Sequence, residues 1–161
     1  MELTLQEKAI LREGGGANGL NASAERSEII CELGQELLER EWHRLLQATI
    51  DDEEAALLLG LSKERLRENI QSQELKLYTI ARPTGSWAFP LWQFSGDGLI
   101  PHLDGLMGAL SREVHPVTVF RFMTTENRDL EIDTSDSCLS PQEWLARGYD
   151  LDPVIVQVKD L

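Results

Sequence analysis

The stretch from residue 50 to residue 94 constrains the fold most, because it opens with the start and stop signals of two short helices in close succession. Asp51 and Glu54 form an Asp-x-x-Glu capping pair, which predicts that the first helix begins there. Gly60 predicts the end of that helix, since glycine adopts the left-handed backbone conformation without a steric penalty. A tight turn is therefore expected directly after Gly60.

Ser62 predicts the start of the second helix, which we expect to run from Lys63 to about Gln71. Leu66 and Ile70 lie one helical turn apart and define its buried side. Two short helices joined by a turn that contains glycine form the arrangement with which DNA-binding proteins place a second helix in the major groove.

The residues after the second helix predict a small β-hairpin. Residues 75–80 (LKLYTI) alternate and contain strand formers, residues 83–85 (PTG) are a turn signal, and residues 86–89 (SWAF) return as a second strand. The predicted fold class is therefore mainly α with a small two-stranded β wing: a winged helix-turn-helix followed by a C-terminal helical domain.

Two motifs in this stretch carry a family resemblance. Glu54-Ala-Ala…Leu58…Gly60-Leu-Ser62, with the second helix and the hairpin, is similar to the MerR/excisionase type of winged helix-turn-helix. Phe89-Pro-Leu-Trp-Gln-Phe94 resembles bacterial DNA-binding proteins in which a Tyr/Phe-Pro-x-Trp-Gln-Phe box follows the wing. The resemblance implies a winged domain over residues 49–94 that binds double-stranded operator or promoter DNA.

Six residues of this stretch are the predicted DNA contacts. Those at the start of the second helix are Ser62, Lys63, Arg65 and Arg67, and those of the hairpin, which we expect to bind phosphates, are Lys76 and Arg82. Glu64 and Glu68 face the same exposed side and oppose phosphate binding, so these cations are equally consistent with an ordinary solvated surface.

The charge balance weighs against nucleic acid, because affinity for DNA depends on neutralising phosphates. The chain has a net charge of −13, divided as −4 over residues 1–48, −2 over residues 49–94 and −7 over residues 95–161. The acidic excess is therefore concentrated outside the predicted reading head, which itself is not basic.

The first 48 residues predict a helical region. We expect a short helix over residues 1–13, a flexible connector over residues 14–23 and a long amphipathic helix over residues 24–47. Its apolar stripe is formed by Ile30, Leu33, Leu37, Leu38, Trp42 and Leu45. The stripe is explained either by packing on the winged domain or by a dimer interface, since half-site recognition usually uses two reading heads. We expect a homodimer.

The C-terminal region, residues 95–161, predicts several short helices separated by loops. Pro101 opens one helix, Pro116 another, and we expect a polar, acidic loop from residue 124 to residue 138. Ser140-Pro-Gln-Glu143 is a capping box with proline in the first turn, Gly148 ends that helix, and Asp152-Pro153 opens the last one.

A second resemblance lies in this region. Residues 119–127 (VFRFMTTEN), residues 139–148 (LSPQEWLARG) and Asp152-Pro-Val154 are similar to the toxin-binding domain of Xre/MbcA/ParS-type antitoxins. The resemblance implies an antitoxin whose C-terminal domain binds a RES-type toxin that consumes NAD, and whose N-terminal domain binds its own promoter. We predict that Trp144, Arg147 and Asn127 contact this protein partner, with Trp144 as the anchor.

Two functions therefore remain open: a sequence-specific DNA-binding regulator that controls its own operon, and a protein-binding antitoxin with little or no DNA binding. Catalysis is not expected, because the sequence has no nucleophile elbow, HExxH, P-loop or GxGxxG motif. Two cysteines and three scattered histidines predict no metal site, and no cofactor is expected. The chain has neither an apolar run long enough for a membrane span nor a signal peptide, so we expect a cytoplasmic protein.

Overall fold

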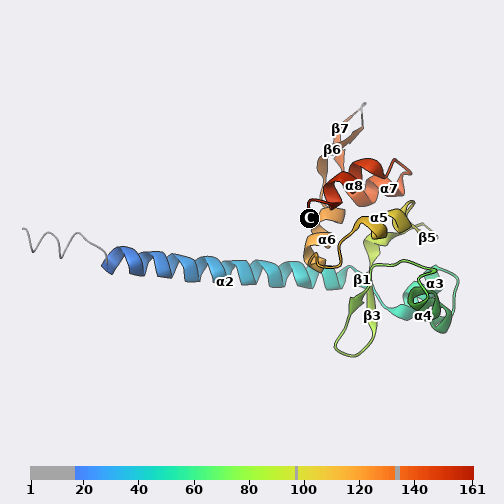
Figure 1. Ribbon diagram of the computed structural model, residues 1–161, viewed down its shortest axis with the longest axis horizontal. Coiled ribbons are helices and arrows are strands. Elements are labelled where there is room, and N and C mark those ends of the chain that lie inside the picture. The colour runs from blue at the N-terminus through green and yellow to red at the C-terminus, as the bar shows by residue number, and fades with distance from the viewer. Residues whose placement is uncertain (1–16, 97, 133–134) are drawn as a thin grey trace, which may run out of the picture. The chain divides into compact units, whose positions relative to one another are not determined.

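The computed structural model describes residues 17–96, 98–132 and 135–161, with the backbone alone at residues 17–26, 28, 29, 132 and 135–137 (Figure 1). The chain divides into two compact units, residues 1–40 and residues 41–161. It is mainly α-helical with small antiparallel sheets, as expected. The short helix predicted over residues 1–13 lies outside the described residues.

The long helix α2 (Ala17–Gln47) contains the helix predicted over residues 24–47. It begins earlier than expected, so the prediction of a flexible connector is wrong for residues 17–23, which are helical. Gly19 and its polar neighbours are weak helix formers. However, one glycine costs only about 1 kcal/mol relative to alanine, and adding residues to an existing helix costs less than starting one.

Helices α3 (Asp52–Leu58) and α4 (Lys63–Gln71) confirm the two predicted short helices. Asp51 accepts hydrogen bonds from the backbone N–H groups of Glu53 and Glu54, and the Glu54 side chain bonds back to the backbone of Asp51, which completes the capping box. Gly60 has φ +65°, and Ser62 caps α4 by accepting from the backbone N–H of Arg65.

A three-stranded antiparallel sheet packs beside these helices. Its strands β1 (Thr49–Ile50), β3 (Trp87–Pro90) and β2 (Ile80–Ala81) lie in that order. The register pairs Ile50 with Phe89 and Ile80 with Ala88. The hairpin β2–β3 confirms the predicted turn, but the first strand is wrong over residues 75–79, which pair with no strand, and β1 was not predicted.

The chain continues through short elements into the C-terminal region. They are the 3-10 helix η1 (Leu91–Gln93), strands β4 (Phe94–Ser95) and β5 (Gly98–Leu99), and helices α5 (Leu103–Ala109) and α6 (Pro116–Thr124). The helix expected at Pro101 starts at Leu103 instead, because His102 has φ 63° and cannot continue a helix.

The last elements are strands β6 (Asn127–Ile132) and β7 (Ser135–Leu139) and helices α7 (Pro141–Ala146) and α8 (Asp152–Val158). The two helices confirm the predicted starts. The polar loop expected over residues 124–138 is wrong, because β6 and β7 pair as antiparallel strands, and their Leu130 and Leu139 are both buried. These two leucines anchor to the core a hairpin whose sequence is otherwise mostly polar.

One hydrophobic core runs through the second unit. It includes residues from the α3–α4 segment, the three-stranded sheet and the C-terminal helices, among them Leu45, Leu66, Phe89, Trp92, Leu106, Leu130, Leu145 and Val154. The residues predicted as a winged domain and as a C-terminal domain therefore share one compact unit. Over the described residues, no helix combines the length and the hydropathy needed to cross a membrane.

Candidate nucleic-acid interface

The predicted DNA-binding segment is organised around a buried carboxylate that sequence reasoning missed. Asp52 is the first residue of α3, and its side chain is only 5% exposed. Lys63 Nζ lies 3.3 Å from Asp52 Oδ1, and Arg67 donates from Nε to Oδ2 at 3.0 Å and also from its terminal nitrogen. One carboxylate thus binds two cations of α4 and holds α3 and α4 together.

The charges around Asp52 decide its ionisation. Burial raises the pKa of the Asp52 carboxyl, but the hydrogen bonds from Arg67 and Lys63 and the charges of both cations act the other way and leave the pKa below its ordinary value. The pKa of Lys63 is raised, because its ammonium donates to Glu53 and to Asp52. Asp52 and Lys63 are therefore both charged at neutral pH.

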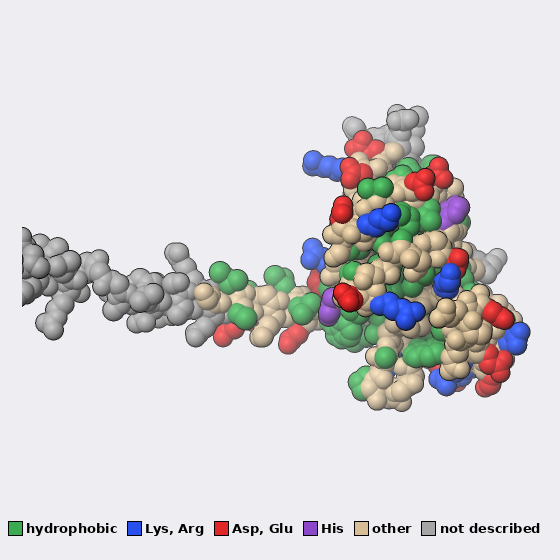
Figure 2. Space-filling view, viewed as in Figure 1, with side chains coloured by type: hydrophobic (Ala, Val, Ile, Leu, Met, Phe, Trp, Pro, Cys, Tyr) green, Lys and Arg blue, Asp and Glu red, His purple; other side chains and the backbone are tan. Residues whose placement is uncertain are grey.

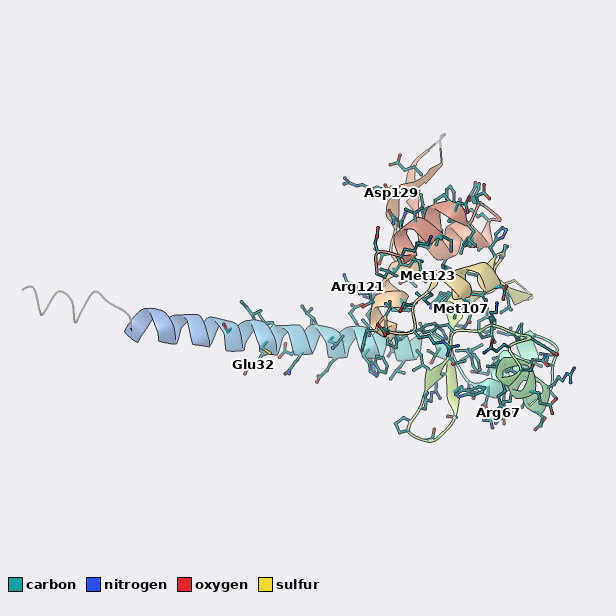
Figure 3. The ribbon with its side chains drawn as sticks, in the orientation of Figure 1. Glu32, Arg67, Met107, Arg121, Met123 and Asp129 are labelled. Atoms are coloured by element: carbon teal, nitrogen blue, oxygen red, sulfur yellow. The ribbon has the colours of Figure 1, made fainter. Side chains whose placement is uncertain are left out.

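Arg67 also connects α4 to the sheet. Its guanidinium carbon lies 6.0 Å from the centre of the Trp87 ring on β3, within the range of a cation–π contact. Trp87 in turn meets Phe89 edge-on, with ring centres 6.5 Å apart. Figure 3 shows Arg67 between α4 and the hairpin β2–β3. Arg67 therefore helps fix the hairpin relative to α4, and 42% of its side chain remains exposed.

Arg65 is the most exposed cation of α4. Its side chain is 62% exposed and lies 3.4 Å from Glu68, which is 66% exposed. An exposed ion pair of this kind contributes little and is easily exchanged for another partner. Arg65 is thus available to a phosphate or a base at little energetic cost, although Glu64 and Glu68 keep the surface mixed in charge.

The remaining predicted contacts have other local roles. Ser62 is exposed and caps α4. Lys76 lies 2.8 Å from Asp104 in an exposed ion pair, and Arg82 on the hairpin donates to the Thr49 hydroxyl at 3.3 Å. The structure therefore places Ser62 at the N-cap of α4, three of the cations on α4, and Lys76 and Arg82 on the segment that leads into and through the hairpin.

Gln93, in the predicted Phe-Pro-x-Trp-Gln-Phe box, holds this segment in place. Its side chain is fully buried, accepts from the backbone N–H of Tyr78 at 2.9 Å, and donates to the carbonyls of Tyr78 and Pro90 at 3.0 and 3.1 Å. These bonds satisfy the backbone groups of residue 78, where no strand pairs. The polar Gln93 between the aromatic residues Trp92 and Phe94 was the sequence signal that could have predicted these buried hydrogen bonds.

The residues predicted to contact a protein partner lie elsewhere in the second unit. Trp144 on α7 is half-buried, stacks on Tyr149 with ring centres 4.5 Å apart, and donates from Nε1 to the carbonyl of Asp150 at 2.7 Å. Arg147 is exposed at the end of α7. Asn127, at the start of β6, bonds to Gln157 of α8 and accepts from the backbone N–H of Asp129.

The β6–β7 hairpin beside these residues presents carboxylates. Glu126, Asp129 and Glu131 are exposed, and Cys138 Sγ lies 3.8 Å from Glu131. Partial burial and the charges of Glu131 and Glu126 raise the pKa of the Cys138 thiol, which makes it a poor nucleophile at neutral pH. Across the described residues, His, Cys, Asp and Glu form no group of three that could hold a metal ion.

The comparisons with known proteins address the fold only. No protein-family model matches the chain, and no curated protein matches it. Among solved structures, the chain is similar to one named "NMR structure of Rv2175c", with 22% sequence identity and a TM-score of 0.51 over 70% of this chain and 79% of that chain. At this identity the likeness supports a shared fold and says nothing of function.

Proposed function

We propose that this protein is a sequence-specific DNA-binding transcriptional regulator of the antitoxin type that controls its own operon. In this proposal α3, the turn at Gly60 and α4 are a helix-turn-helix, the β2–β3 hairpin is its wing, and α4 is the recognition helix. Operator DNA is the partner.

The observation that carries the proposal is the connection of α4 to both neighbours by one side chain. Arg67 binds the buried Asp52 of α3 and lies against Trp87 of the hairpin. A recognition helix must be held rigidly relative to the elements that contact the DNA backbone, because base readout depends on its orientation. Arg65, free of such a structural role, is then the cation of α4 best placed to reach a base or a phosphate.

The net charge of the whole chain overstates how strongly the carboxylates near α4 would repel DNA. Of the carboxylates near α4, Asp52 is compensated by two cations and Glu53 lies 3.3 Å from Lys63, whereas Asp51 and Glu54, held in the capping box, keep their charge. The carboxylates that oppose DNA on α4 itself are Glu64 and Glu68. We therefore expect modest, salt-sensitive affinity that depends strongly on Arg65.

The test is fluorescence anisotropy of the full chain against DNA from upstream of its own gene, at two salt concentrations. Arg65→Ala should weaken specific binding by about 10-fold or more and reduce the salt dependence, because one cation–base or cation–phosphate contact is lost. Arg128→Ala is the matched control, since Arg128 is an exposed arginine of the β6–β7 hairpin. Equal binding by the Arg65 and Arg128 variants would refute α4 as the reading element.

A second candidate function is favoured by the Trp144–Tyr149 pair beside the acidic hairpin. In it the chain is an antitoxin whose C-terminal surface binds a RES-type, NAD-consuming toxin, with little or no DNA binding. An aromatic pair next to exposed carboxylates suits a partner with a basic rim. Co-purification with the product of an adjoining reading frame should then be lost with Trp144→Ala and kept with Arg65→Ala, which is the reverse of the result expected for DNA.

A further inference from the structure

We infer that α2 carries a self-association surface that binds a second copy of this chain through close contact at Gly34. The surface, called here the α2 stripe, consists of Ile30, Leu33, Gly34, Leu37 and Leu38. It lies wholly within the first compact unit. The inference does not depend on the proposed DNA binding.

The apolar side chains of the α2 stripe are exposed. Ile30 is 69% exposed, Leu33 53%, Leu37 59% and Leu38 48%, and Figure 2 shows hydrophobic side chains standing out along the described part of α2. Helices in water gain most of their stability by burying an amphipathic face against a partner. Four large apolar side chains on one face of α2 therefore indicate that something covers them.

Gly34 indicates how closely that partner approaches. At about 100° per residue, Gly34 falls within the stripe, between the directions of Ile30 and Leu38. Glycine is among the poorest helix formers, yet a Cβ added at Gly34 would meet no atom within 4 Å, and the residue lies in regular helix. Nothing among the residues that the structure describes accounts for a glycine here. A helix packed tightly against this face would account for it.

A second copy fits the stripe because the stripe contains both halves of such a contact. In tight helix pairing, a side chain of one helix fills a hole formed by four residues of the other. The spacing i, i+3, i+4, i+7 of such a hole is present at Ile30, Leu33, Gly34 and Leu37. Gly34 makes this hole deep, and the leucines of the same stripe can fill the hole of the other copy. A two-fold contact needs such a self-complementary patch.

The charges of α2 are compatible with this pairing. Glu32 and Glu39 fall on the face of the helix opposite the stripe, where both are exposed, whereas Glu41 falls in the direction of the stripe beyond Leu38 and lies 3.0 Å from Arg44. Repulsion between two acidic copies therefore acts mainly across solvent, where salt screens it.

The experiment is sedimentation of the full chain from about 1 µM to about 100 µM, spanning the range of moderate dimer affinities. A reducing agent is present, since Cys31 on α2 is exposed and could otherwise form a disulfide. The natural chain should dimerise with rising concentration. Gly34→Leu should weaken the dimer by about 10-fold or more in Kd, because its side chain fills the hole, although leucine is a better helix former than glycine.

Two matched variants separate this contact from general effects. Leu37→Ala should also weaken the dimer, whereas Leu57→Ala should not, although Leu57 of α3 is the more exposed leucine at 81%. Circular dichroism should show helix content unchanged or increased in Gly34→Leu. The inference is overturned if the natural chain sediments as a monomer throughout, or if Gly34→Leu dimerises as tightly as the natural chain.

Discussion

Helices α3 and α7 begin with the same local device and serve different surroundings. Both have a capping box, with Asp51 and Glu54 at α3 and Ser140 and Glu143 at α7. The residue directly after the cap is buried in both cases, but it is Asp52 in α3 and Pro141 in α7. The first binds two cations of the next helix, whereas the second has no side-chain polar group.

This difference shows that a capping box predicts where a helix begins but not which contacts the helix makes. At α3 the first turn carries charge that fixes α4 and, through Arg67, the hairpin β2–β3. At α7 the buried residue of the first turn is the apolar Pro141, and the functional candidate is an aromatic residue further along, Trp144 on Tyr149. The α3 site is organised by ion pairs and the α7 site by ring packing.

The largest loss of stability is expected when Asp52 is replaced. Asp52→Ala should lower the free energy of unfolding by about 3 kcal/mol, because it leaves two cations without their shared carboxylate, with the effect reduced by their partial exposure. Pro141→Ala should cost only about 1 kcal/mol, from lost chain rigidity and contacts. Urea denaturation of both variants measures the difference. Equal losses would show that charge is not what distinguishes the two helix starts.

A smaller loss is expected at the aromatic pair of the α7 site. Trp144→Ala should destabilise the protein by about 2 kcal/mol, since Trp144 is only half-buried but loses both its stacking on Tyr149 and its hydrogen bond to the Asp150 carbonyl. Trp144→Phe keeps the stacking and isolates the hydrogen bond, so it should cost about 1 kcal/mol. If the two variants behaved alike, the ring contact would contribute nothing measurable.

The two capping side chains should contribute equally to the stability of the fold. Asp51→Ala and Ser140→Ala should each cost about 1 kcal/mol, the usual effect of removing a capping side chain. The same urea experiment compares them. A loss at one cap more than twice that at the other would mean that its side chain has a role beyond capping.

The pH dependence separates the two sites further. Hydrogen bonds from the Ser140 backbone and hydroxyl hold the pKa of Glu143 below its ordinary 4.5, and the cations hold that of Asp52 below its ordinary 3.8. A lowered pKa in the folded state gives stability that is present above the ordinary pKa and is lost as the pH falls through the lowered one. As the pH falls, the natural chain's advantage in free energy of unfolding over Glu143→Gln should therefore begin to shrink first, below about pH 4.5. Its advantage over Asp52→Asn should begin to shrink only below about pH 3.8. Thermal unfolding between pH 6 and pH 3 measures both, at less than about 1.4 kcal/mol per pH unit for each group. If an advantage did not change over this range, that carboxyl would have no lowered pKa in the folded state, and its assigned partners would be contradicted.

Local signals in the sequence determined several of the helix boundaries of the second unit. Asp51, Gly60, Ser62 and Ser140 each predicted a start or a stop that the structure confirms. Caps and left-handed glycines act on backbone groups a few residues away, so the chemistry that fixes them is legible in the sequence. The predicted DNA and protein contacts were chosen in the same way, by residue type and helical position, and these remain predictions.

Only the tertiary structure decided what these elements bind to. The sequence does not reveal that Asp52 pairs with Arg67, that Gln93 satisfies the backbone of Tyr78 in place of a strand, or that β1 joins the sheet through Phe89. The pairing of β6 with β7 escaped prediction for the same reason, since Leu130 and Leu139 are anchored by the core and not by a local pattern. Contacts between distant residues depend on which surfaces the folded chain brings together, and a local pattern of residue types does not contain that information.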